Sequence, residues 1–257
     1  GEGEPAWPSA GGDSMRGSLL GPEFSESEIR RALEAHGAVF ERLDETAMLE
    51  RAAGLLADGA MLGWFQGRME FGPRSLGGRS ILGDARLASM QSAINQKVKF
   101  RESFRPFAPA VLEERAGEYF DLTAESPYML LVADVAKSQR LARPADESAG
   151  FARLKHARST LPAVTHVDGS ARVQTVGRER HPFFWRLLRQ FEQRTGCGVL
   201  LNTSFNVRGE PVVCTPDDAY RCFVNTAIDW LAIGPFLLSR ERQPVEKPQP
   251  AFDPIPD

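Results

Sequence analysis

Hydrophobic residues recur at helical spacing in five segments of the chain: residues 25–37, 44–59, 89–97, 182–194 and the segment that follows Thr215. Apolar positions three and four residues apart lie on one face of a helix, so each segment is predicted to be helical. The clearest is 182–194, which begins with a proline and is followed by Gly196. Four of the helices have a polar residue that is predicted to cap the first turn: Ser25, Asp44, Ser89 and Thr215.

Short apolar runs predict the strands of a sheet. Buried strands are expected at residues 60–65, 107–112, 128–135 and 199–201, with a short strand at 39–43 and one or two more within 228–238. Residues 163–176 have the pattern of a hairpin that turns at Asp168 and Gly169. Strands mixed with helices and hairpins predict one α/β domain with a mixed sheet.

Composition sets the limits of this domain. Residues 1–22 contain six glycines and three prolines and are predicted to be a linker or lead-in, whereas 241–257 is a proline-rich tail. The domain itself is expected at 23–240. Residues 137–160 are polar and lack periodicity, which predicts a mobile loop. Because the sequence starts with glycine and not methionine, we expect a fragment of a longer protein.

The overall composition narrows the class of protein. With 257 residues, 42% hydrophobic and 25% charged, the chain is typical of a globular protein and not of a collagen, a coiled coil or a disordered chain. The longest apolar run, 128–133, is far shorter than the roughly 20 residues of a membrane span. Without a secretion signal at the start, a cytoplasmic location is expected. Three cysteines without Cys-x-x-Cys spacing suit small buried thiols and predict neither a disulfide nor a metal site.

Charge is distributed unevenly. The chain as a whole carries −3, but the window 68–105 holds eight basic and three acidic residues, so it carries +5 and the remainder −8. A basic segment in an acidic protein concentrates positive potential locally. It indicates either a site for phosphates or carboxylates or an ordinary solvated face with exposed ion pairs.

The first candidate motif is the glycine-rich segment 67–80 within this window. Its glycines allow a ligand to approach the backbone, and Arg74 and Arg79 are candidates to bind phosphate oxygens. The segment is not a P-loop, because Gly78 stands where that motif requires lysine. The alternative is a tight surface turn with solvated arginines.

The second candidate motif, residues 97–109, contains four cations. Alternation predicts a strand with Val98 and Phe100 on one face and, on the other, Lys97, Lys99 and Arg101. Arg105 follows, next to a rigid proline. Cations held close together repel one another unless an anion lies between them.

Nucleic acid is the competing ligand for this second motif. Nucleic-acid platforms usually expose aromatic side chains between their cations, and Phe100, Phe104 and Phe107 are available for that role. The same three residues are equally suited to a hydrophobic core. We therefore favour a phosphate ligand over nucleic acid.

The third candidate motif is the polar segment that follows the predicted strand at 199–201. Asn202, Ser204 and Asn206 leave the carboxyl end of a buried strand, where open α/β sheets bind their ligands. Local turns formed by Asn and Ser side chains explain the same residues without a ligand. Arg172, after the predicted hairpin turn, is a weaker candidate cation.

The motifs do not suggest nucleophilic catalysis. No Ser/His/Asp arrangement, acidic pair or activated cysteine stands out, and His166 and His181 are interpreted as structural residues. Many cations with few titrating bases suit phosphoryl or nucleotidyl transfer, in which positioning and charge stabilisation provide most of the acceleration.

Four segments taken together resemble one known family. Residues 67–77, 99–109, 165–175 and 200–211 are similar, in this order, to motifs of the O-carbamoyltransferases of nodulation-factor and antibiotic biosynthesis. The resemblance covers about 20–240 and implies the C-terminal, YrdC-like half of those enzymes, an open twisted mixed sheet with flanking helices. The actin-like-fold N-terminal domain, which carries a metal and the acceptor site, is expected to be missing.

The resemblance implies an activity. The YrdC-like domain of that family uses ATP and carbamoyl phosphate to form carbamoyl adenylate, with release of pyrophosphate and phosphate. The N-terminal domain then transfers the carbamoyl group to a hydroxyl of a natural product or sugar. Mg²⁺ is expected to bridge the ATP oxygens and to be held largely by the nucleotide. No membrane partner is expected, nucleic acid is disfavoured, and a homodimer is compatible with the sequence.

The resemblance also implies roles for individual residues. Four residues correspond to cations that bind carbamoyl phosphate and the nucleotide phosphates: Arg74, Lys99, Arg105 and Arg172. The first three are the expected catalytic residues. Asn202 and Ser204 correspond to residues that orient either substrate, and Arg79 and Asn206 are added more weakly. Gly78 departs from the family pattern, where a larger residue is usual. Two alternatives remain: a non-catalytic YrdC-like module that binds RNA or phosphate, and a domain that mainly forms an interface and exposes an apolar patch.

Overall fold

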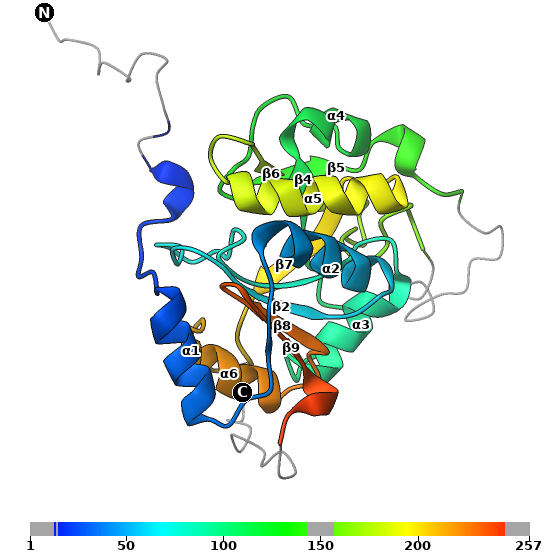
Figure 1. The fold of residues 1–257 in the computed structure, drawn as a ribbon. Coiled ribbons are helices and arrows are strands. Elements are labelled where there is room, and N and C mark those ends of the chain that lie inside the picture. Colours follow the sequence, from blue (N-terminus) through cyan, green and yellow to red (C-terminus); the bar gives the residue numbers. More distant parts are fainter. Residues whose placement is uncertain (1–12, 14, 143–156, 245–257) are drawn as a thin grey trace, which may run out of the picture.

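The computed structural model describes residues 13, 15–142 and 157–244. Within them, the chain forms an open mixed sheet of nine strands with six α-helices around it, which confirms the predicted α/β class (Figure 1). Most of the predicted lead-in 1–22, the loop 137–160 and the proline-rich tail lies outside the described residues. None of the helices in the described ranges is both long and apolar enough to span a bilayer.

The predicted helices are all present. Their bounds are α1 (Glu26–Ala35), α2 (Glu45–Ala57), α3 (Ala88–Lys97), α5 (Pro182–Thr195) and α6 (Pro216–Val224), with an additional short α4 (Ala116–Tyr119). Ser25 and Thr215 cap α1 and α6 in capping boxes, and Asp44 caps α2. The predicted cap at Ser89 is wrong: α3 begins one residue earlier, after Leu87, and has no side-chain cap.

The strands form one sheet in the order β1-β9-β8-β2-β3-β7-β4-β6-β5. The pairs β2–β8 and β4–β6 are parallel and the other neighbouring pairs are antiparallel. Their bounds are β1 (Glu41–Arg42), β2 (Leu62–Phe65), β3 (Arg79–Asp84), β4 (Ala108–Leu112), β5 (Leu131–Asp134), β6 (Ser170–Val176), β7 (Val199–Ser204), β8 (Trp230–Ile233) and β9 (Phe236–Ser239).

Helices α2 and α5 pack side by side over the middle of the sheet (Figure 1). Helix α2 contacts β2 and β3, and α5 contacts β4 and β7. The four apolar residues predicted to face the core from α5 are completely buried: Phe184, Leu187, Leu188 and Phe191. Burying a side chain of this size stabilises the fold by about 1.5–3 kcal/mol. The helices α1 and α6 form a second pair, in which α6 contacts β2 and β8.

The predicted hairpin at 163–176 is only partly right. The chain does turn at Asp168 and Gly169, where the His166 amide donates to the Ser170 carbonyl (2.8 Å). However, 163–167 is not a strand, and β6 pairs with β4 and β5 instead. Strand β6 is buried along almost its whole length, so it needs a partner strand on each side, and these partners come from distant parts of the chain.

The edge strand β5 exposes apolar side chains. Leu130 and Val132 are 70% and 62% exposed, and Leu131 lies between them. An apolar edge of this kind agrees with the domain-interface alternative, which predicts an exposed apolar patch.

Candidate functional site

The glycine-rich segment forms a loop, residues 66–78, that joins β2 to β3. A buried carboxylate, Glu70, holds the end of this loop: it accepts hydrogen bonds from the amides of Leu76 (2.6 Å), Gly78 (2.7 Å) and Arg79 (3.2 Å). Glu70 was not among the predicted site residues. The available signal was an acid placed among the cations of the basic window.

Two glycines allow the loop to close against its surroundings. Gly77 has a φ of +112°, and a Cβ there would lie 2.4 Å from a ring carbon of Phe184. A Cβ at Gly78 would lie 2.6 Å from the carbonyl oxygen of Arg68. The departure from the family pattern at Gly78 therefore has a steric reason in this chain.

We expect Gly77→Ala to destabilise the protein by about 3 kcal/mol or more, because it combines backbone strain with a clash against a core ring. Gly72→Ala is the matched control: Gly72 also has a positive φ (+141°), but a Cβ there has no neighbour within 4 Å. The control should lose only about 1–2 kcal/mol. Urea unfolding of both variants measures the difference, and equal losses would contradict the role of the Phe184 contact.

Two buried amides of the sheet support the same loop from the other side. The Asn202 side-chain amide donates to the Ser75 carbonyl (3.1 Å), and that of Gln174 donates to the Leu76 carbonyl (2.7 Å). The Asn202 amide also donates to the side-chain oxygen of Gln174 (2.7 Å), across strand β4. The β4 residues in register with them are Ala108 and Ala110, whose small side chains leave room for this contact. Gln174 was not predicted.

Arg74, at the start of this held segment, lies near Arg172 on β6. Burial lowers the pKa of the Arg172 guanidinium, and the positive charge of Arg74 lowers it further. Both side chains have an enclosed Nε without a hydrogen-bond partner. Among the described residues, neither arginine forms an ion pair. Two like charges in a partly dehydrated place, with no carboxylate between them, favour a bound anion.

Lys99 contacts two other predicted site residues, Ser204 and Asn206, at the end of β7. Its Nζ donates to the backbone and side-chain oxygens of Ser204 (2.5 and 3.2 Å) and of Asn206 (2.9 and 2.7 Å). Lys99 is only 4% exposed, and burial, followed by the charge of Arg101, lowers its pKa to about 7. The structure thus brings Lys99, Ser204 and Asn206 together, with their polar atoms used largely by one another.

The predicted alternation of 97–101 is wrong. Lys99 is buried, whereas Phe100 is 56% exposed and has a φ of +47°. The amides of Lys99 and Arg101 donate to the carbonyls of Ile94 and Asn95, so the segment wraps around the end of α3 and is not extended. The alternation of polar and apolar residues cannot predict these backbone hydrogen bonds to the end of α3.

Further cations follow along the same loop. The Arg101 Nε donates to the Asn95 side chain (2.7 Å), and its guanidinium lies over the Phe107 ring. Arg105 is exposed and forms an ion pair with Glu102 (3.1 Å). The charge of Arg105 lowers the pKa of Arg101, although burial has the larger effect. The charge of Arg105 therefore affects the pKa of Arg101, and the charge of Arg101 affects the pKa of Lys99.

Arg79, a weaker candidate ligand for phosphate, has its guanidinium occupied by groups of the protein. Its side chain is fully buried over the Phe65 ring, and its guanidinium donates to the carbonyls of Gly67, Gly78 and Pro22. Burial lowers its pKa to about 10. Arg79 points back under the loop, where it ties the loop to the segment before α1.

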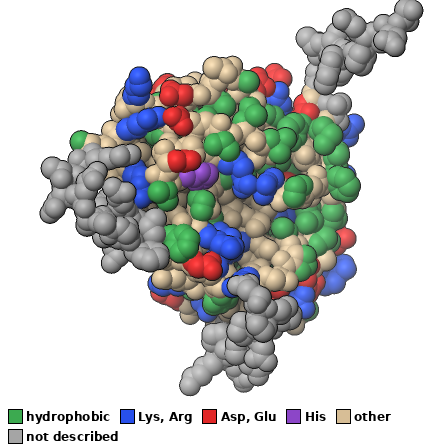
Figure 2. Space-filling view, turned by 180° about the vertical axis from the view of Figure 1, so that it is seen from behind, with side chains coloured by type: hydrophobic (Ala, Val, Ile, Leu, Met, Phe, Trp, Pro, Cys, Tyr) green, Lys and Arg blue, Asp and Glu red, His purple; other side chains and the backbone are tan. Residues whose placement is uncertain are grey.

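The space-filling view from behind shows how charge is distributed on that face (Figure 2). Lys and Arg side chains lie around a hollow near its centre, beside a histidine. Acidic side chains also lie beside the histidine and beside one of the basic groups, so this face carries charges of both signs. Burial lowers the pKa of His166, the charge of Asp168 opposes this effect, and the charge of Arg172 adds to it.

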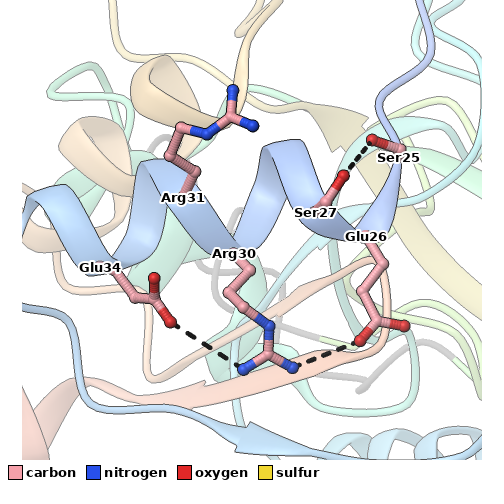
Figure 3. A pocket seen from close by; sticks show the side chains of 6 residues that line it. All are labelled: Ser25, Glu26, Ser27, Arg30, Arg31 and Glu34. Atoms are coloured by element: carbon pink, nitrogen blue, oxygen red, sulfur yellow. Dashed lines mark hydrogen bonds and ion pairs between the residues drawn. The ribbon is translucent and has the colours of Figure 1, made fainter.

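The hollow beside α1 has a different character (Figure 3). It has a volume of about 560 Å³ and is lined by residues of α1 and its cap alone. Arg30 forms ion pairs with Glu26 and Glu34 one turn away on each side, and Ser25 and Ser27 share a hydrogen bond. Its charges are mostly neutralised within the helix, as on an ordinary solvated helix face.

His181 precedes α5 and lines a cavity of about 360 Å³ behind the loop, together with Gln66, Gly67 and Phe183. Part of the residue is exposed, but its Nε2 is enclosed without a partner. Burial lowers its pKa to about 4. A histidine that stays neutral at physiological pH agrees with the structural interpretation.

His181 is expected to make the fold sensitive to acid. The unfolded chain takes up this proton near pH 6.5 and the folded chain only near pH 4, so stability falls as the pH drops through that interval. The loss is about 2–3 kcal/mol. In His181→Gln the free energy of unfolding should depend less on pH over this range, as measured by urea titrations. Parallel pH profiles for the two proteins would contradict the assignment.

Comparison with known proteins shows the family of this chain. Residues 53–240 match the model of the family described as "Carbamoyltransferase C-terminus". The chain belongs to this carbamoyltransferase family. The matched range includes all the predicted site residues, from Arg74 to Asn206, and also Glu70 and Gln174.

Three relatives illustrate the breadth of this carbamoyltransferase family. An uncharacterized protein of Synechocystis is 55% identical over 90% of this chain and 38% of its own length. The nodulation protein NolNO of Sinorhizobium fredii is 44% identical, over 86% of the chain and 30% of the relative. The 3'-hydroxymethylcephem-O-carbamoyltransferase of Amycolatopsis lactamdurans is 37% identical, over 72% and 32%. The chain thus spans about a third of the length of these curated relatives.

Proposed function

We propose that this domain binds carbamoyl phosphate and ATP and forms carbamoyl adenylate for an O-carbamoyltransferase. One water and carbamoyl phosphate give carbamate and phosphate. A carbamate oxygen then attacks the α-phosphorus of ATP, and the bond to pyrophosphate breaks. The remaining part of the longer protein, with the expected actin-like fold, would transfer the carbamoyl group to a hydroxyl of a natural product or sugar. The same proposal includes a YrdC-like fold for this domain.

The observation that carries the proposal is the arginine pair Arg74 and Arg172. Their proximity, their enclosed Nε atoms and the absence of a described carboxylate partner favour a doubly charged ligand such as a phosphate group. Membership of the carbamoyltransferase family supports carbamoyl phosphate or a nucleotide phosphate as the proposed ligand. Two highly charged substrates require several fixed cations before they can react.

The residues of the site would share the work as follows. Arg74 and Arg172 bind one phosphate group, and Arg101 and Arg105 attract the triphosphate. Lys99 lies at the end of β7, where Ser204 and Asn206 fix its position and a nearby anion would favour its charged form. Asn202 acts through the loop that it supports, because it is only 1% exposed. All of these groups bind or orient substrates, and none is assigned a proton transfer.

Metal-ligating side chains for Mg²⁺ do not cluster in the part of the chain that the structure describes. These residues contain no group of three or more His, Cys, Asp or Glu that could hold a metal ion. The proposal is that Mg²⁺ binds together with the nucleotide, and no step here is assigned to it.

The test is an exchange reaction with the chain itself. Incubation with ATP, labelled pyrophosphate, Mg²⁺ and carbamoyl phosphate should move label into ATP, and omission of carbamoyl phosphate should stop it. Transfer to an acceptor hydroxyl is not expected from this chain alone. Absence of exchange together with tight RNA binding would overturn the proposal.

RNA binding is the second candidate, because the structure exposes two of the three aromatic residues in the basic loop. Phe100 and Phe104 are 56% and 49% exposed near Arg101 and Arg105, whereas Phe107 is buried. Exposed aromatics beside cations are suited to stacking with bases. This alternative predicts RNA affinity that falls steeply with salt and is lost in Phe100→Ala, with no exchange activity.

A further inference from the structure

The segment 75–78 is the most tightly held part of the glycine-rich loop, and it directly follows Arg74. Its amide side is bound by Glu70, which is 6% exposed and receives hydrogen bonds from three backbone amides. Its carbonyl side is bound by Asn202 and Gln174. The loop is therefore fixed from both sides by buried groups.

This arrangement has an electrostatic consequence. Arg74 and Arg172 repel each other, and an unrestrained loop would let Arg74 swing towards water, where its charge is better solvated. Nothing on the Arg74 side chain itself opposes this movement, since no partner for it is found among the described residues. The restraint on Arg74 comes from the backbone that follows it.

The chemistry of position 70 is specific. The three groups that point at its side chain are all N–H donors: the Leu76 and Gly78 amides donate to one oxygen, Oε1, and the Arg79 amide lies within reach of both Oε1 (3.3 Å) and Oε2 (3.2 Å). A glutamine at this position keeps one acceptor oxygen, but its NH₂ group replaces Oε2 and faces the Arg79 N–H. The same carboxylate favours the charged form of the buried Arg79 guanidinium beneath the loop.

We infer that Glu70 is a positioning residue for anion binding: through the backbone of 76–79 it holds Arg74 against Arg172, so that both face one phosphate group. Gln174 performs the same task from the sheet with a single hydrogen bond. The inference rests on the proposed function in one respect, that Arg74 and Arg172 share an anion.

A double-mutant cycle in the full chain tests it, with inorganic pyrophosphate as the probe in calorimetric titrations. Arg74→Ala should weaken pyrophosphate binding by about tenfold to hundredfold. Glu70→Gln should weaken it by about tenfold or more although Glu70 itself does not touch the probe. In the Arg74→Ala background, Glu70→Gln should change the affinity by less than about twofold, since there is no longer an arginine to position.

The matched control is Glu23→Gln, which removes an exposed carboxylate paired with Arg68 on the outer side of the same loop (3.5 Å). It should leave pyrophosphate affinity unchanged. If Glu70→Gln does not fold, Gln174→Leu carries the test, with an expected loss of about threefold to tenfold that again disappears without Arg74.

The outcomes separate the two claims. If the fold-losses of pyrophosphate affinity from Glu70→Gln and Arg74→Ala multiply in the double variant, the positioning role is overturned while the anion site stands. The same holds if Glu70→Gln lowers the melting temperature but leaves pyrophosphate affinity normal. A wild-type chain that does not bind pyrophosphate overturns the proposed function itself, and with it the role of Glu70.

Discussion

Arg172→Met is expected to reduce carbamoyl-phosphate-dependent ATP/pyrophosphate exchange by about two to three orders of magnitude, without destabilising the protein. The activity falls because a charge-assisted contact to phosphate is lost. The fold is spared because Arg172 repels Arg74 and makes no ion pair with another described residue. Exchange rates and thermal unfolding, measured on the same preparation, check both halves.

Arg178→Met provides the control for Arg172. It removes the same charge from an exposed position just beyond β6, where the guanidinium lies over Trp185. Exchange should be nearly unaffected. If Arg172→Met retains full exchange, or unfolds at a much lower temperature than Arg178→Met, Arg172 is a structural cation and the anion site is misplaced.

Lys99→Met is expected to damage both stability and activity. The variant leaves the oxygens of Ser204 and Asn206 without their buried donor, and each unsatisfied group costs about 1–3 kcal/mol. We expect a total loss of about 2–4 kcal/mol in the free energy of unfolding, with exchange reduced at least about a hundredfold. Urea unfolding and the exchange assay measure the two effects.

Lys97→Met is the matched variant here, since Lys97 is exposed on the last turn of α3, two residues away. It should change stability by less than about 0.5 kcal/mol. An equal effect of the two substitutions would show that Lys99 contributes only to the general charge of the basic window.

The two expected phenotypes distinguish what these cations do. The Nε of Arg172 has no hydrogen-bond partner among the described residues, whereas the ammonium group of Lys99 donates to oxygens of the protein. In the sequence Lys99 is the more prominent candidate, because it lies in a basic run and Arg172 has uncharged neighbours on both sides. The number of cations in a segment says little about which of them has a free guanidinium or ammonium group.

The sequence alone determined the local features of this protein. The helix caps at Ser25 and Thr215, the apolar stripe of α5 and the end of this helix at Gly196 all appear as predicted. Each depends on hydrogen bonds and side-chain contacts between residues at most a few positions apart. The mixed α/β class followed from the same local signals taken together.

Only the tertiary structure decided which polar groups meet. Three hydrogen bonds join residues about a hundred or more positions apart: those of Gln174 and Asn202 to the loop, and that of Lys99 to Ser204. Glu70 bonds within its own loop, and that loop packs closely against Phe184 of α5 at Gly77. Arg79 and Arg74 look alike in the glycine-rich motif, yet one is buried on carbonyls and the other faces Arg172. Such pairings depend on the order of strands in the sheet, which the packing of distant segments sets and local sequence does not encode.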